Sequence, residues 1–176
     1  MTTAIAPVSL PADQELLARV LRPYKPNCRY VTAMTISAGD DGGVRGFAEL
    51  AIGESCYIDD TGHLNAVEVN IAYNQMLYYV IATSVRERLI PAFADWTMAD
   101  YWRRQLPDIL ITKLTTRFRR PIDRSGFFGE FELRYATRRR LNPVGPALIA
   151  LDTGFRFWDA RGGRADGDVT IAVGES

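Results

Sequence analysis

The sequence has little of what several functional classes require. Its 176 residues include two cysteines and one histidine, and 21 Lys and Arg residues balance 21 Asp and Glu residues, so the formal net charge is zero. This balance argues against a general nucleic-acid or membrane-surface binder, because both need a basic excess. Cys28 and Cys56 fit no zinc spacing and no dense disulfide framework, so we expect free thiols and no metal site.

Segments for export or membrane insertion are also missing. The first residues lack a basic region followed by an apolar one, and no run approaches the roughly 18 apolar residues of a membrane-spanning helix. A G-x-S-x-G elbow, a P-loop and a G-x-G-x-x-G turn are absent as well. We therefore expect a cytoplasmic protein without a membrane partner.

The length fits one domain, which at this size buries roughly 70% of its unfolded surface without needing metals or disulfides. We expect residues 1–12 to form a flexible arm and residues 13–176 to form the domain. Asp13 can cap a short helix that begins near Gln14. Two strands, 28–37 and 44–52, then follow, joined by a hairpin turn at residues 40–43.

Residues 61–88 predict one long helix that is apolar on nearly every side, which is typical of a helix enclosed by protein. A short helix at 98–106 precedes strands at 109–119, 127–137, 147–158 and 164–173, with breaks at Pro121, 142–143 and 161–163. Residues 138–140, three arginines, are interpreted as a solvated loop. An antiparallel sheet that accompanies an apolar helix must curl around it, so we predict an α+β hot-dog domain. Its uncovered edge favours a homo-oligomer, at least a dimer, with a hexamer as a further option.

The densest polar segment, residues 53–68, leads into the start of the long helix. Free backbone N–H groups and the positive end of the helix dipole are expected there. These groups would polarise a thioester carbonyl toward an enolate or a tetrahedral oxyanion.

His63 and Glu68 are the candidate proton-transfer groups of this segment. The ordinary pKa of histidine suits proton transfer at neutral pH, but a surface or helix-capping role explains His63 equally well. Glu68 lies among apolar neighbours, where a carboxylate is costly unless it is paired or used. The alternative interpretation is that Glu68 forms a structural ion pair with an arginine.

Asn65 and Glu68 are three residues apart and share a helix face, whereas Asn74 lies roughly 180° away from Asn65 on a straight helix. One pocket of one subunit would hold both asparagines only if Asn65 lies at an irregular helix start. Tyr57 and Tyr24 are candidate hydroxyl donors, although a tyrosine ordinarily packs its ring and makes one hydrogen bond.

Lys113, Arg117 and Arg119 alternate along a predicted strand and so share one face. They could bind a phosphopantetheine phosphate, an acidic carrier-protein surface or a small carboxylate. A solvated strand face is the other reading of the same pattern.

These features together resemble the FcoT-like thioesterase family, a hot-dog family that acts on fatty acyl thioesters. The resemblance covers about residues 13–173, and its most specific part is the block from Tyr57 to Asn74. The matching segments are 15–21, 23–24, 28–30, 52–55, 57–58, 61–63, 65–68, 74–75, 117–119 with Pro121, and 157–159.

The resemblance implies a site made of Tyr24, Tyr57, Asn65 and Asn74, without an obvious nucleophile. Some members of the family are long-chain acyl-CoA thioesterases. Others belong to isonitrile lipopeptide or β-amino-acid biosynthesis and add glycine to a (2E)-enoyl thioester on an acyl carrier protein. We favour glycine addition, which makes the chain a C–N lyase-class glycyltransferase with an acyl carrier protein, glycine and a fatty enoyl thioester as partners.

In this hypothesis His63 or Glu68 is the general base, while Tyr57, Asn65 and the helix-start amides hold the thioester oxygen. Tyr24 and Asn74 position the substrate, and Lys113 or Arg117 binds the glycine carboxylate. No cofactor is expected beyond the phosphopantetheine of the carrier protein or coenzyme A that bears the acyl group. A long-chain acyl-CoA thioesterase and a non-catalytic acyl-binding module are the alternatives.

Overall fold

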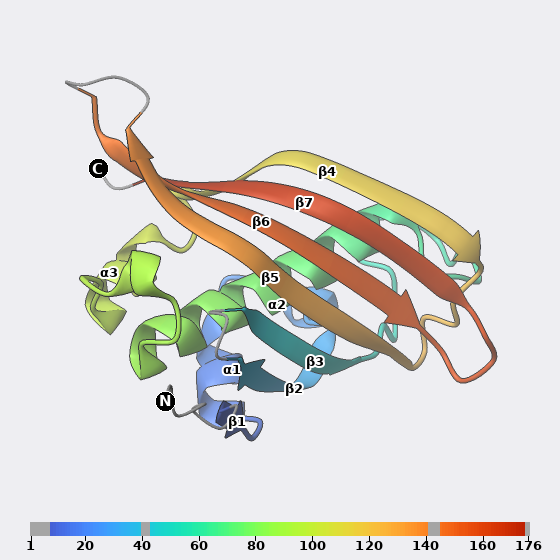
Figure 1. The fold of residues 1–176 in the computed structure, drawn as a ribbon. Coiled ribbons are helices and arrows are strands. Elements are labelled where there is room, and N and C mark those ends of the chain that lie inside the picture. The colour runs from blue at the N-terminus through green and yellow to red at the C-terminus, as the bar shows by residue number, and fades with distance from the viewer. Residues whose placement is uncertain (1–7, 40–42, 141–144, 175–176) are drawn as a thin grey trace, which may run out of the picture.

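The computed structural model describes residues 8–39, 43–140 and 145–174 (Figure 1). Seven strands form one antiparallel sheet in the order β1-β2-β3-β5-β6-β7-β4. The strands are β1 Val8–Leu10, β2 Val31–Ala38, β3 Val44–Leu50, β4 Ile109–Arg120, β5 Phe127–Arg140, β6 Ala147–Trp158 and β7 Arg164–Gly174. The helices are α1 Gln14–Val20, α2 Ala66–Glu87 and α3 Met98–Arg104, with short 3₁₀ turns η1 Pro26–Cys28 and η2 Pro91–Phe93.

The sheet curves over α2, which crosses beneath it from the end near β4 to the end near α3 (Figure 1). The α2 side chains pack against the inward positions of the strands; Tyr73, for example, lies 5.8 Å from Phe131 and 5.4 Å from Phe155 between ring centroids. This is the hot-dog arrangement that the apolar helix predicts. No helix among the described residues combines the length and apolar character of a membrane crossing.

The predicted elements are confirmed with three corrections. Within the expected arm, residues 8–10 form β1, because they pair with the edge of β2, where Val8 lies opposite Ala38. Residues 138–140 extend β5 instead of forming a loop, because β6 continues to pair with them. The long helix begins at Ala66 instead of near residue 61. The expected break around residues 142–143 and most of the 40–43 turn lie outside the described residues.

Enclosure of α2 is also uneven along its length. Every residue from Gln75 to Val85 is buried, as expected for a helix inside a wrapped sheet. In the first turns, however, Val67 is 47% exposed, Asn70 is exposed, and Ile71 and Asn74 are half-buried. These four residues have the i, i+3, i+4, i+7 spacing of one continuous helix face, here called the α2 stripe.

Candidate functional site

The N-terminus of α2 is built by a reciprocal capping box between Asn65 and Glu68. The Asn65 Oδ1 accepts hydrogen bonds from the backbone N–H groups of Val67 (3.0 Å) and Glu68 (3.2 Å), and Glu68 Oε2 accepts one from Asn65 N–H (3.1 Å). These bonds occupy most of the amides that would otherwise be free at a helix start. The Ala66 N–H is the first-turn amide left without a partner in the described part of the chain.

Each of these two side chains also has a second polar atom that takes no part in the cap. Asn65 Nδ2 and Glu68 Oε1 are buried, and neither has a hydrogen-bond partner among the described residues. Glu68 as a whole is 0% exposed. A buried polar atom without a partner costs free energy, so a donor and an acceptor left unpartnered in the same capping box are suited to a polar ligand.

Tyr57 belongs to the same group of residues. Its side chain is 49% exposed, and its hydroxyl donates a hydrogen bond to Asn65 Oδ1 at 2.7 Å. Because the Tyr57 hydroxyl already donates its proton to Asn65, this tyrosine orients the asparagine in the present structure. The structure thus brings Tyr57, Asn65 and Glu68 together, as the sequence suggested.

His63 lies close to this group but in a different environment. His63 is exposed, and it lines a pocket of about 290 Å³ together with Asn65, Ala66 and Phe118. Glu68 does not line that pocket. The two candidate bases therefore occupy different surroundings, one open to solvent and one inside the protein.

Asn74 lies further along α2, and Tyr24 packs beside the next turn of the same helix. The Tyr24 ring lies 6.5 Å from that of Tyr78, and Tyr78 follows Asn74 by four residues on the same helix face. Burial, followed by the neighbouring Tyr78, raises the pKa of Tyr24. Asn74 is about 13 Å from Asn65 along the axis, at 1.5 Å per residue. Within one chain, the four residues that the family resemblance implies therefore do not meet in one place.

Lys113 and Arg117 lie on the opposite side of the sheet from α2. They pair with Thr170 and Asp166 of β7, whereas the alternate β7 residues, such as Val169 and Ile171, are buried in the core. Directly opposite residues of an antiparallel pair share a face, so both cations point to the outer surface. The structure does not bring them to the α2 N-terminus.

Arg124 and Asp60 are residues that the sequence did not single out. The Arg124 side chain is 12% exposed and contacts Asp60 through Nε to Oδ1 and Nη2 to Oδ2, both at 2.8 Å. Its Nη1 donates to the Ile52 carbonyl at 3.0 Å, and its charge is also attracted by Glu68. Asp60 in turn accepts from the N–H of Gly62, whose φ of 73° is in the left-handed region. Arg124 therefore shapes the turn that presents His63 and Asn65.

The two cysteines lie beside this site. Cys28 and Cys56 are free, half-buried thiols, and Cys56 Sγ is 3.5 Å from the Tyr30 hydroxyl. Burial and then the hydrogen-bonding Cys56 side chain raise the pKa of Cys28 to about 11. The buried Gln75 of α2 donates to the Cys28 carbonyl at 2.5 Å and accepts from the Tyr30 N–H at 2.8 Å, which fixes η1 against the helix.

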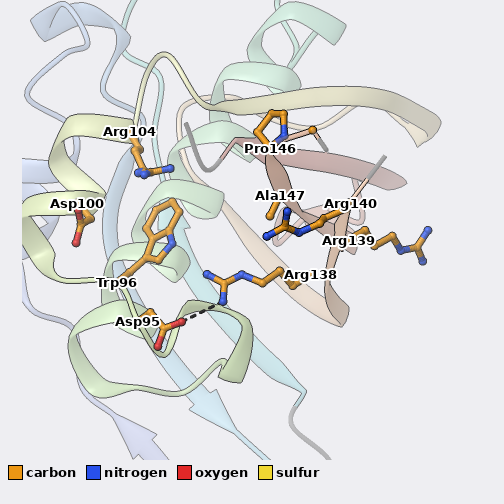
Figure 2. Close-up of a pocket in the computed structure, with 10 residues that line it drawn as sticks. Asp95, Trp96, Asp100, Arg104, Arg138, Arg139, Arg140, Pro146 and Ala147 are labelled. Carbon is orange, nitrogen blue, oxygen red and sulfur yellow. Dashed lines mark hydrogen bonds and ion pairs between the residues drawn. The ribbon is translucent and has the colours of Figure 1, made fainter. Parts of the chain in front are cut away.

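A larger pocket, of about 680 Å³, lies at the other end of the molecule, beside α3 (Figure 2). Figure 2 shows Arg104 stacked over Trp96, with its Cζ 5.0 Å from the ring centroid, and Arg138 paired with Asp95 at 3.0 Å. None of the candidate site residues lines this pocket. Among the described residues, no group of His, Cys, Asp or Glu is arranged to hold a metal ion.

Comparison with known proteins agrees with the family suggested by the sequence. The model of the FcoT-like thioesterase domain matches residues 19–173. A (2E)-enoyl-[ACP] glycyltransferase from Streptomyces coeruleorubidus is 50% identical over 91% of this chain and 96% of its own length. A protein of the same name from Mycobacterium tuberculosis is 36% identical, over 94% of this chain and 88% of its own.

Among solved structures, a putative thioesterase from Shewanella oneidensis aligns with a TM-score of 0.49 at 13% identity. The alignment covers 92% of this chain and 98% of that one.

Proposed function

Because this chain belongs to the FcoT-like thioesterase family, we propose that it is a (2E)-enoyl-[ACP] glycyltransferase. It adds glycine to the β-carbon of an α,β-unsaturated acyl thioester and yields a β-(carboxymethylamino)acyl thioester. The observation that carries this proposal is the 50% identity, over nearly the whole chain, to a relative of that name. The buried donor and acceptor at the α2 N-terminus support it with a site of suitable chemistry.

The reaction is an addition, so no group leaves. The glycine ammonium transfers one proton to Glu68, and the freed amine forms a C–N bond at the β-carbon. The electrons of the C=C bond move to the thioester oxygen, which becomes an enolate. The protonated Glu68 then delivers its proton to the α-carbon, which restores the carbonyl. Asn65 Nδ2 and the Ala66 N–H hold the enolate oxygen, because both are donors without a partner in the described structure.

Between the two candidate bases, the surroundings favour Glu68. Its free Oε1 is buried beside Asn65, where an incoming ammonium would compensate the unpartnered oxygen. His63 is exposed and lines the outer pocket, so its role in this proposal is at the entrance. Tyr57 orients Asn65 through the 2.7 Å hydrogen bond.

The complete site also needs a second copy of the chain. Tyr24 and Asn74 keep their role in positioning the substrate, but they lie further along α2 than Asn65 in one chain. The α2 stripe leaves this helix uncovered between the two groups, and a partner packed on it would join them into one cleft. A homodimer is therefore part of the proposal. The expectations of no added cofactor and of a cytoplasmic location are kept from the sequence. The acyl group arrives on the phosphopantetheine of a carrier protein or of coenzyme A.

The test is to incubate the protein with a (2E)-enoyl acyl carrier protein, with and without glycine, and to weigh the intact carrier. We expect a mass gain of one glycine that depends on both the protein and glycine. A saturated acyl carrier protein is the matched control, because it lacks the C=C bond and must gain nothing.

Two other outcomes would contradict the proposal. Loss of the acyl group without any glycine-dependent gain would identify a thioesterase, in which Glu68 orients water. Retention of an unchanged acyl chain, together with measurable binding, would identify a non-catalytic acyl-binding module.

A further inference from the structure

We propose that Arg22, Lys25 and Arg29 form the surface on which the acidic acyl carrier protein docks. This inference rests on the proposed function, because it names the surface that receives the substrate carrier. It concerns the segment between α1 and β2, here called the basic segment, residues 22–29.

The first support is the charge of this part of the chain. Residues 16–39 contain four cations, Arg19, Arg22, Lys25 and Arg29, and no acidic residue, although the whole protein is neutral. Arg19 lies over the Trp102 ring at 4.1 Å. The other three are exposed, and none has a carboxylate within 4.0 Å among the described residues. Such unpaired cations attract an acidic partner.

The second support is the fixed conformation of the segment. The Arg29 guanidinium donates from Nε to the Tyr24 carbonyl at 3.1 Å and from Nη2 to the Arg22 carbonyl at 3.3 Å. These bonds hold the Arg29 side chain against the backbone of residues 22–24, and the Cys28 N–H donates to the Lys25 carbonyl at 2.9 Å, so the backbone that carries the three cations is fixed. The surface is thus pre-organised, which lowers the ordering cost of binding.

The third support is closeness to the site. Cys28 of the segment is held to α2 by Gln75 at 2.5 Å, and the hydroxyl of Tyr30, just after the segment, lies 3.5 Å from the Sγ of Cys56, which precedes Tyr57. Tyr24, a proposed substrate-positioning residue, lies between Arg22 and Lys25. A carrier bound here would deliver its phosphopantetheine arm alongside Tyr24 and toward the group at the α2 N-terminus.

Lys113 and Arg117, which the sequence also suggests for this role, lie on the outer face of the sheet, away from α2. Several other cations are already paired with carboxylates or lie far from the site. On the outer face of the sheet, Arg45 pairs with Glu132, Arg119 with Asp166, and Arg134 with Asp152 and Asp168, so their charge is already compensated. Arg139 and Arg140 line the pocket of Figure 2, at the end of α2 remote from Glu68. With 22 residues at 1.5 Å each, α2 separates the two ends by about 33 Å.

The experiment measures binding of a fluorescently labelled (2E)-enoyl acyl carrier protein by anisotropy, so it does not depend on turnover. The variants are R22E/K25E and, as the control of matched charge, R139E/R140E. Arg29 is left intact because its side chain holds the segment. We expect R22E/K25E to raise the Kd at least about tenfold at low salt. The control should stay within about threefold of wild type, and added salt should weaken wild-type binding.

Turnover of a small (2E)-enoyl pantetheine thioester with glycine provides the second measurement. R22E/K25E should retain wild-type turnover of this substrate, since the substrate has no carrier to dock. Unchanged carrier binding in R22E/K25E, or a loss in R139E/R140E as large as in R22E/K25E, would overturn the docking surface. Absence of glycine addition to the small thioester by the wild type would instead contradict the proposed function, and the anisotropy result would still decide the docking surface.

Discussion

Asn65 and Glu68 cap α2 for each other with one side-chain oxygen apiece, and each keeps a second polar atom buried without a partner. The Glu68 N–H donates to Asn65 Oδ1 at 3.2 Å, and the Asn65 N–H donates to Glu68 Oε2 at 3.1 Å. The buried atoms without a partner are Asn65 Nδ2 and Glu68 Oε1. In the proposed function, the capping atoms stabilise α2 and the other two atoms of the same side chains take part in the reaction. Substitutions that change one atom at a time can separate them.

Asn65→Asp should lose activity while it keeps the oxygen that caps α2. Aspartate caps a helix as well as asparagine does, and it keeps an oxygen for Val67, Glu68 and Tyr57. It removes the Nδ2 donor, however, and loss of one such donor to a developing oxyanion costs about 100-fold in kcat. Thermal unfolding and glycine-addition kinetics are the two measurements. Gln14→Glu, an equal charge change on α1, is the control and should leave the glycine-addition kinetics unchanged; equal activity in Asn65→Asp would exclude Nδ2 from the reaction.

Asn65→Ala removes the cap as well as the donor. We expect it to lower the free energy of unfolding by about 1 kcal/mol in addition to the loss in kcat. Urea unfolding of this variant beside Asn65→Asp checks the separation. If both variants unfold alike, the capping bonds contribute nothing to stability and the assignment of atoms fails.

Glu68→Gln and His63→Gln distinguish the two candidate bases. Glutamine at position 68 keeps a carbonyl oxygen for the Asn65 N–H but cannot take a proton. We expect its kcat to fall by at least about 100-fold, within the range of general-base catalysis. His63→Gln should stay within a few-fold of wild type, because His63 is exposed at the entrance. Single-turnover rates with carrier-bound enoyl substrate are the measurement, and the reverse pattern would make His63 the base.

The Asp60–Arg124 ion pair should make stability fall at acid pH. The hydrogen bonds from Arg124, and then the Gly62 N–H, lower the pKa of Asp60 from 3.8 to about 2. A carboxylate whose pKa is lower in the folded state adds stability above its unfolded pKa, and this contribution is lost as pH falls from about 4 toward 2. The gap in unfolding free energy between wild type and Asp60→Asn should therefore be widest at pH 6 and narrow below pH 4. Urea titrations across this range test it, and a constant gap would show that the ion pair does not titrate with folding.

Local patterns were sufficient for most of the fold. Apolar periodicity located α2 and the strands of the last third, and Asp13 does cap α1 through the Leu16 N–H at 2.9 Å. The same periodicity predicts a start of α2 that is too early, although the Asn65-x-x-Glu68 spacing is itself a capping-box signature. This spacing places the helix start at the position that the structure shows.

The parts of the site that sequence could not provide depend on distant contacts. Arg124 meets Asp60 across 64 residues, and no local pattern encodes that pairing. Lys113 and Arg117 do share a face, but a β-bulge between Ile111 and Lys113 decides which face it is. Ile111 lies opposite the buried Ile171, and the extra residue turns Lys113 to the outer side. One inserted residue therefore moves both cations away from α2.

The α2 stripe should be the contact that completes the site. Ile71 is half-buried on an otherwise enclosed helix, and its neighbour Val67 is 47% exposed, so burial against a second copy would remove apolar surface from water. Ile71→Glu would place a charge in that contact. We expect it to convert a dimer to a monomer by analytical ultracentrifugation and to reduce glycine addition by at least about tenfold, since an unpaired buried charge is strongly unfavourable. Ala18→Glu, on the exposed side of α1, is the control and should remain dimeric. An Ile71→Glu variant that stays dimeric and active would show that subunits associate elsewhere and that Tyr24 and Asn74 do not act across the stripe.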